Sequence, residues 1–122
     1  MRAILINPED KTVTEVDYDG DYKSIYKLIG CSKFDIVRTS TSNDGIYIDD
    51  EGLYAPIQFK WQFTFDNAYE PIKLVNKGLV LGCDDEGDSV APDSTIEDIK
   101  KNITWDSELL QPGFLIKSLT DG

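Results

Sequence analysis

Histidine is absent from the 122 residues of this chain. Because histidine is the commonest general base near neutral pH and the commonest metal ligand, its absence excludes Ser-His and Cys-His catalytic arrangements. Glycine-rich phosphate-binding loops of the G-x-x-x-x-G-K and G-x-G-x-x-G types are also missing. We therefore expect a protein that is not an enzyme and that holds no cofactor and no metal ion.

Long hydrophobic runs and cysteines are scarce as well. No apolar stretch approaches the roughly 20 residues of a membrane-spanning helix, and the N-terminal stretch from Ala3 to Ile6 is shorter than the roughly 7 to 15 residues of a signal-peptide core. Cys31 and Cys83 each follow a glycine at the edge of an apolar segment, so they could be neighbours in space. Two reduced thiols are the favoured interpretation, with a disulfide or a catalytic thiol as alternatives. We expect a cytoplasmic protein that makes no membrane contact.

Positive charge is the third shortage. Aspartate and glutamate number 23 against 12 lysines and arginines, which gives a formal net charge of -11. This charge opposes direct binding to nucleic acid or to anionic membranes and attracts basic protein surfaces. A chain of this length has room for one domain.

Short apolar groups separated by turn formers predict the secondary structure. Strands are predicted over residues 2–6, 12–18, 34–38, 45–49, 59–66 and 78–82. Apolar residues at i, i+3, i+4 and i+7 predict a helix over residues 21–29, capped by Asp19 or Asp21 and ended by Gly30. Ser94 to Glu97 matches a capping box that begins a second helix.

These elements predict the α+β class, with a single compact domain over residues 1–105 in which two short helices pack on a mixed or mostly antiparallel β-sheet. Residues 78–82 are wholly apolar, so this strand is expected to be central and buried on both faces. The segment from Thr39 to Gly45 is rich in turn formers and predicts an exposed loop. Residues 106–122 form a C-terminal tail, for which we favour an added edge strand.

The strand over residues 59–66 places four aromatic side chains on one face, namely Phe59, Trp61, Phe63 and Phe65. Such a face buries a large apolar area, so we interpret it as part of the core. The alternative is an exposed platform on which single-stranded nucleic acid stacks. The acidic composition disfavours that alternative.

The same four-residue acidic motif occurs twice, as Asp49-Asp50-Glu51-Gly52 and as Asp84-Asp85-Glu86-Gly87. Acidic turns offer calcium its oxygen ligands, but neither copy has the spacing of an EF-hand loop. Paired carboxylates also serve glycosidases, although no second motif singles out a pair here. We interpret both copies as solvated turns whose glycine permits a positive φ.

The segment from Asp84 to Asp98 is the most charged part of the chain and contains no lysine or arginine. Its acidic residues are Asp84, Asp85, Glu86, Asp88, Asp93, Glu97 and Asp98. A solubilising surface and a docking face for a basic partner are the two interpretations of this asymmetry. Together with Asp49, Asp50 and Glu51, these residues are the candidate binding site.

Six stretches of the sequence are similar to a known protein family: residues 1–8, 12–16, 28–31, 49–53, 76–82 and 95–99. Together they resemble a small family of unknown function found in bacteriophages, plasmids and the bacteria that carry them. The resemblance covers about residues 1–105 and implies no activity. It does imply a mobile-element setting, in which small acidic proteins often act on the nucleic-acid machinery of the host.

Charge and setting together predict a non-enzymatic accessory protein that binds a host protein. We expect it to dock on a basic, nucleic-acid-binding surface, as an anti-defence inhibitor or nucleic-acid mimic. Duplex DNA carries one charge per about 1.7 Å, so a domain about 35 Å across would need roughly 20 charges to match it. The mimic therefore needs its acids on one face, or a homodimer that joins two such faces.

The alternative function is a small-molecule or nucleotide-binding module without catalysis. Such a module needs basic and aromatic side chains that converge on one pocket. The basic candidates in the middle of the chain are Arg38, Lys60, Lys73 and Lys77.

Overall fold

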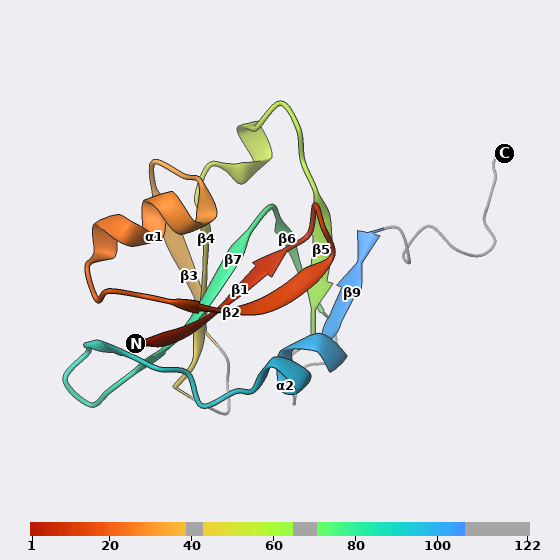
Figure 1. The fold of residues 1–122 in the computed structure, drawn as a ribbon. Coiled ribbons are helices and arrows are strands. Elements are labelled where there is room, and N and C mark those ends of the chain that lie inside the picture. The colour runs from red at the N-terminus through yellow and green to blue at the C-terminus, as the bar shows by residue number, and fades with distance from the viewer. Residues whose placement is uncertain (39–42, 65–70, 107–122) are drawn as a thin grey trace, which may run out of the picture.

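The computed structural model describes residues 1–38, 43–64 and 71–106, which form two antiparallel sheets and two helices (Figure 1). The larger sheet has the order β2-β1-β7-β4-β3, with β8 added to β7. Its strands are β1 (Arg2–Asn7), β2 (Thr12–Asp17), β3 (Phe34–Arg38), β4 (Gly45–Asp49), β7 (Gly78–Cys83) and β8 (Ser89–Val90). The smaller sheet has the order β6-β5-β9, from β5 (Lys60–Phe63), β6 (Ile72–Val75) and β9 (Ile103–Trp105). The predicted α+β class with a mostly antiparallel sheet is confirmed, although the strands form two sheets.

Strand β7 is the centre of the larger sheet, as its apolar sequence predicts. It pairs with β1 on one side and with β4 on the other. On one face of the sheet Leu79 and Leu81 belong to the core cluster that contains Ile25 of helix α1 (Tyr22–Ile29). Val80 faces the opposite way, into the cluster that contains Trp61 of β5 and side chains of helix α2 (Ile96–Lys101). The larger sheet is therefore a middle layer between α1 and the smaller sheet with α2 (Figure 1).

Both helices begin with a capping side chain. Asp21 accepts a hydrogen bond from the backbone N–H of Lys23, and Gly30 ends α1 with φ +67°, a backbone conformation that favours glycine. In α2 the capping box is formed by Thr95 and Asp98, one residue later than the predicted pair of Ser94 and Glu97. The prediction of a second helix is right, but its start was placed one residue too early.

The aromatic strand is part of the core. Trp61 and Phe63 are 1% and 4% exposed, and they pack between the two sheets. The indole Nε1 of Trp61 donates a hydrogen bond to the backbone oxygen of Asn76 at 2.7 Å, so its polar atom is satisfied inside the core. This burial rules out a stacking platform at Trp61 and Phe63, while Phe65 lies outside the described residues.

Asp44 corrects the prediction of an exposed loop over residues 39–45. Its side chain is 1% exposed, and its carboxylate accepts hydrogen bonds from the backbone N–H groups of Asp93 and Ser94, each at 2.9 Å. Arg2 holds the same segment, because its guanidinium donates to the backbone oxygens of Pro92 and Ser94. The connection between β8 and α2 is thereby fixed against the larger sheet. Residues 39–42 lie outside the described residues.

The smaller sheet ends with β9, which precedes the predicted C-terminal tail and pairs with β5 through Trp61 and Trp105. The edge strand predicted for residues 106–122 falls on residues that, after Asp106, lie outside the described part of the chain. Within the described residues, no helix is long and apolar enough to span a membrane.

Candidate functional site

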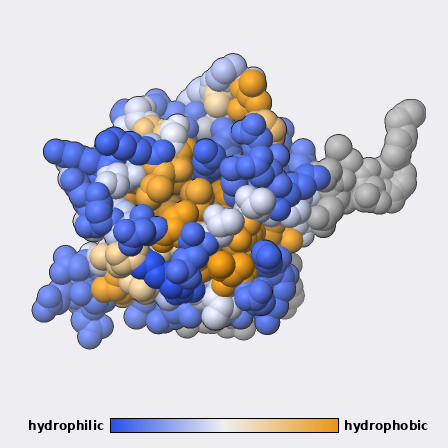
Figure 2. Space-filling model, in the orientation of Figure 1, coloured by the Kyte–Doolittle hydropathy of each residue, from blue (hydrophilic) through white to orange (hydrophobic). Residues whose placement is uncertain are grey.

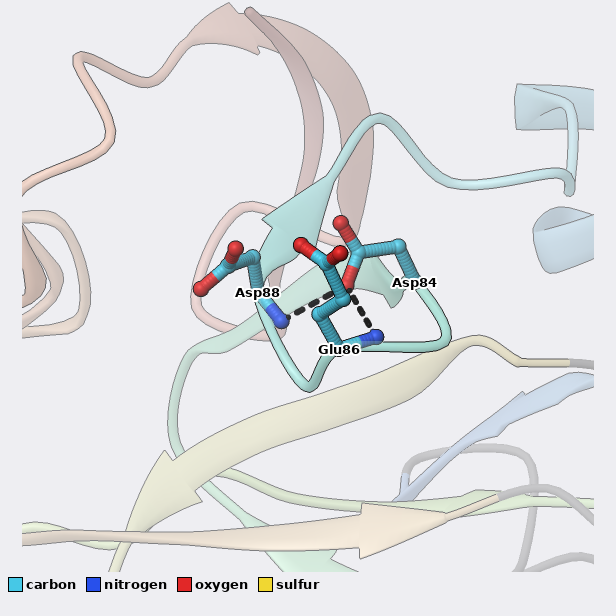
Figure 3. A group of neighbouring side chains, drawn as sticks. All are labelled: Asp84, Glu86 and Asp88. Carbon is cyan, nitrogen blue, oxygen red and sulfur yellow. Dashed lines mark hydrogen bonds between the residues drawn. The ribbon is translucent and has the colours of Figure 1, made fainter.

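The turn between β7 and β8 presents the predicted acidic residues on a fixed backbone (Figure 3). The Oδ1 atom of Asp84 accepts hydrogen bonds from the backbone N–H groups of Glu86 and Asp88, at 2.9 and 2.8 Å. The Asp84 backbone N–H in turn donates to the Asp88 oxygen at 3.0 Å. Asp84 is therefore a structural residue of the turn, and it holds the exposed carboxylates of Glu86 and Asp88 in place.

The same turn brings three carboxylates together. Asp84, Glu86 and Asp88 each offer an oxygen atom, and these atoms lie within 4.8 Å of one another. Oxygen groups of this kind suit a hard cation such as Ca²⁺. All three side chains are exposed, and the turn is closed by its own backbone hydrogen bonds, so we assign no metal to it.

The strand register places further acidic residues beside this turn. Tyr18, just after β2, exchanges backbone hydrogen bonds with Met1, so the end of β2 lies beside the start of β1. Strands β1 and β7 are antiparallel, so the start of β1 also lies beside the end of β7. The chain therefore leaves the sheet at the same end after β2 and after β7. Asp93 lies there too, because its backbone N–H is bound to Asp44 beside Gly45. We call this region the acidic end, and its residues are Asp17, Asp19, Asp21, Asp84, Asp85, Glu86, Asp88, Asp93, Glu97 and Asp98.

Hydrogen bonds keep two of these carboxyl groups ionised. The Asp21 backbone N–H and the Ser24 hydroxyl donate to Asp19, and they hold the pKa of the Asp19 carboxyl below its usual range. In the same way, the Thr95 backbone N–H holds the pKa of the Asp98 carboxyl below its usual range. These two carboxyl groups therefore keep their negative charge in mildly acidic solution.

The first acidic motif lies at the opposite end of the larger sheet. Ile48 of β4 pairs with Gly78, at the start of β7. Asp49, Asp50 and Glu51 come directly after Ile48, so they lie at the end of the sheet where β7 begins. The six residues of β7 separate the two motifs by about 20 Å at the usual rise of a strand. The structure therefore brings Asp84, Glu86 and Asp88 together. It places Asp93, Glu97 and Asp98 along the segment that Asp44 and Arg2 hold at the same end of the sheet, and it leaves Asp49, Asp50 and Glu51 apart. The prediction that all ten form one site is wrong in this respect.

The basic residues proposed for a ligand pocket are also divided. Lys60 and Lys73 line one cavity of about 510 Å³ on the outer face of the smaller sheet, together with Gln62 and Asp106. Lys77 lines a different cavity, of about 350 Å³. Arg38 lies beside Gly45 at the acidic end of the sheet. The four residues therefore do not converge, although Lys60 and Lys73 share one cavity.

The two cysteines are not neighbours. Cys31 follows α1, close to Asp49, whereas Cys83 ends β7 at the acidic end, and both thiols are free. Burial, reinforced by the negative charge of Asp49, raises the pKa of the Cys31 thiol to about 11. A thiol of this kind is a poor nucleophile at neutral pH, which disfavours Cys31 as a catalytic thiol. The alternative of a disulfide between the two cysteines is wrong, because both thiols are free.

The segment from Leu53 to Ile57 is not among the binding residues predicted from the sequence. Its large apolar side chains are exposed, Leu53 by 71%, Tyr54 by 86% and Ile57 by 67%. A signal was present in the sequence, because Leu53-Tyr54-Ala55-Pro56-Ile57 is an apolar run with neither strand nor helix periodicity. A proline-containing apolar run directly after an acidic turn indicates an exposed loop rather than a core element.

The comparisons with known proteins identify a family whose function is unknown. A family model described as "Domain of unknown function (DUF3846)" matches residues 1–104. No curated protein and no solved structure matches the chain.

Proposed function

Because the chain belongs to the DUF3846 family, whose function is unknown, we propose a function from its surface: it is a non-enzymatic domain whose acidic end docks on a basic surface of a host protein. The surface that it covers is one that otherwise binds nucleic acid. The protein is an accessory protein of a phage or another mobile element, works in the host cytoplasm and inhibits a host defence by imitating nucleic acid.

The supporting observation is the concentration of carboxylates on segments that are distant in sequence. The end of β2, the β7–β8 turn and the start of α2 all contribute to the acidic end. Arg2 reaches into this region, but its guanidinium already binds Glu15 and the backbone oxygens of Pro92 and Ser94. Two more cations lie at the same end, the Met1 amine, which pairs with Asp17 at 3.2 Å, and Arg38. The ten carboxylates outnumber these cations, so the region keeps a negative field that steers a cationic surface toward this end of the molecule.

The amount of charge matches a short stretch of nucleic acid. The ten carboxylates of the acidic end, less the three cations there, the Met1 amine, Arg2 and Arg38, leave a net charge of about -7, which equals the charge on about 12 Å of duplex DNA. That length is about one third of the diameter of about 35 Å expected for a compact domain of this size. One monomer can therefore imitate part of a duplex, and a homodimer that joins two acidic ends would imitate a longer stretch.

A second candidate function is the binding of a small anion, and the cavity at Lys60 and Lys73 favours it. On the outer face of the smaller sheet, Gln62 pairs with Lys73, and Lys60 is the next residue on that face of β5. The cavity volume of about 510 Å³ is in the usual range for a ligand site. Asp106 also lines the cavity, so its net charge is small. A thermal-shift measurement with nucleoside monophosphates and triphosphates tests this candidate, and Lys73→Ala should abolish any stabilisation.

The main proposal is tested by neutralising exposed carboxylates at the acidic end while Asp84 is retained, since Asp84 holds the turn. The variant combines Asp85→Asn, Glu86→Gln and Asp88→Asn. The matched control removes three exposed acids elsewhere, with Glu9→Gln, Asp10→Asn and Asp35→Asn. Wild-type protein is first used to capture its partner from host lysate at low salt.

With the partner purified, the acidic-end variant should bind at least about tenfold more weakly than wild type, and the control variant should bind nearly normally. Wild-type affinity should also fall as salt rises. The captured protein should lose its nucleic acid when the complex forms. Equal affinities for both variants, or a complex that is indifferent to salt, would contradict the proposal.

A further inference from the structure

The segment from Leu53 to Ile57, which we call the apolar loop, projects from the molecule between β4 and β5 (Figure 1). Its large side chains are Leu53, Tyr54 and Ile57, each more than 60% exposed. Figure 2 shows hydrophobic atoms at the projecting tip of this segment. Exposed apolar residues that cluster in this way mark interaction sites on soluble proteins.

Hydrogen bonds hold the loop in this exposed conformation. A 3-10 turn, η1 (Gly52–Tyr54), is closed by a bond from the Tyr54 N–H to the Glu51 oxygen at 2.9 Å. The side-chain amide of Gln58 donates to the Leu53 oxygen at 2.7 Å. At its base, Gly52 is buried against Val75 of β6. The apolar side chains are therefore presented on a fixed backbone, and little conformational entropy is lost when they bind.

Hollows lie on both sides of the loop. Leu53 lines the cavity of about 510 Å³ on the smaller sheet and a second cavity of about 170 Å³ beside Asp49 and Asp50. Ile57 lines the cavity of about 350 Å³ next to Gly30 and Lys77. A partner surface can therefore both receive the loop and extend into the hollows beside it.

Charge decides among three occupants: a membrane, a second copy of this chain and a different protein. Four carboxylates lie beside the loop: Asp49, Asp50 and Glu51 precede it directly, and Asp35 lines the adjoining cavity. Three lysines, Lys60, Lys73 and Lys77, line the hollows on either side, so the acids outnumber the bases. This local charge and the net charge of -11 oppose contact with an anionic lipid surface. A symmetric contact between two copies would join two surfaces of the same negative sign. A protein with lysine or arginine beside an apolar pocket has the complementary charge.

We propose that the apolar loop is a second protein-binding surface, which inserts Leu53, Tyr54 and Ile57 into an apolar pocket edged by basic residues of a partner protein. It follows the Asp49 motif at the end of the sheet opposite the acidic end, so this inference goes beyond the proposed function. Tyr54 is the anchor, because exposed tyrosines dominate the binding energy of many interfaces once a partner covers them.

The experiment begins with photo-crosslinking in native host cells. Tyr54 is replaced by p-benzoylphenylalanine, and the same replacement at Tyr22, an exposed tyrosine of α1, is the control. Position 54 should yield a discrete cross-linked protein that position 22 does not. The proposal is overturned if position 54 yields only a dimer of this chain, or nothing beyond the control.

The cross-linked protein is then purified and its affinity is measured. Leu53→Ser combined with Ile57→Ser should weaken binding at least about tenfold, Tyr22→Ser should leave it unchanged, and Asp50→Lys should weaken it through repulsion by the basic edge. An unchanged affinity of the Leu53→Ser, Ile57→Ser protein would refute the proposal. Flotation of the wild-type protein with vesicles of phosphatidylcholine, or of phosphatidylcholine and phosphatidylglycerol at 7:3, would refute it in favour of a membrane.

Discussion

The carboxylate of Asp44 and the backbone N–H of Ser94 are hydrogen-bonded at 2.9 Å, although the two residues are 50 positions apart in the sequence. The same carboxylate accepts a bond from the backbone N–H of Asp93. Among the residues that the structure describes, Asp44 is the one buried polar or charged residue. It ties the segment before α2 to the start of β4.

We predict that Asp44→Ala lowers the free energy of unfolding by about 3 kcal/mol, because it leaves two backbone N–H groups without their charged acceptor. Urea unfolding monitored by tryptophan fluorescence measures this change. Asp85→Ala removes an exposed acid from the same end of the molecule and should change stability by less than about 0.5 kcal/mol. A similar small effect of Asp44→Ala would show that its hydrogen bonds contribute little.

Trp61 offers a test of the core between the two sheets. Trp61→Ala should cost about 3 to 5 kcal/mol, since the side chain is fully buried. Trp61→Phe keeps most of the apolar volume but leaves the Asn76 oxygen without the indole donor, so it should cost about 1 to 3 kcal/mol. Chemical denaturation of the three proteins gives the comparison. A Trp61→Phe protein as stable as wild type would mean that the hydrogen bond has no net value.

Gly82 is predicted to tolerate no side chain. A Cβ atom there would lie 2.8 Å from the backbone oxygen of Ala91, so the β7–β8 pairing must shift to admit it. Gly82→Ala should destabilise the protein by about 1 to 3 kcal/mol. Gly52→Ala is the control, because its Cβ would meet Val75 at an ordinary 3.6 Å. Thermal melts measure the change, and an equal fall in the melting temperature of both variants would contradict this explanation.

The Cys31 thiol should react slowly with iodoacetamide at neutral pH. Its pKa is raised to about 11 from an ordinary value of 9.0, so the alkylation rate of a Cys83→Ser protein should rise with pH to a midpoint near 11. Asp49→Asn should lower that midpoint, because it removes the carboxylate that opposes thiolate formation. A midpoint near 9 in the folded protein would show that the thiol is more exposed than the structure indicates.

The same shift has a consequence for stability. The folded state binds the thiol proton more tightly than the unfolded state does, so between pH 9 and about 11 the unfolded state loses this proton first. The contribution of Cys31 to stability is therefore fully present below about pH 9, and it is lost as the pH rises through about 11.

Local patterns in the sequence predicted several elements with their bounds. The two strands β3 and β4 have the predicted limits, Phe34–Arg38 and Gly45–Asp49, because turn formers delimit each apolar run. Helix α1 was likewise found from its spacing and its cap at Asp21. These features depend on neighbours within a few residues, and the sequence displays such neighbours directly.

Features that depend on distant residues were missed or misplaced. The sequence predicts an exposed loop at Asp44, but the residue is buried because it binds Asp93 and Ser94, which are far away in sequence. The start of α2 was misplaced for the same reason: Asp44 and Arg2 bind the backbone of Ser94, and Thr95 takes the capping position instead. The two acidic motifs lie apart because β4 and β7 pair in an antiparallel register, which no local pattern in the sequence reveals.

Strand β7 carries no ionisable side chain except the terminal Cys83, and β1, β4 and β8 all pair with it. Its amide protons should be among the slowest in the chain to exchange with solvent. The residues packed around β7 are thus different from the exposed carboxylates and apolar side chains that we propose as binding surfaces. Substitution of Glu86, Asp88 or Leu53 should therefore change the proposed contacts while the framework around β7 stays folded.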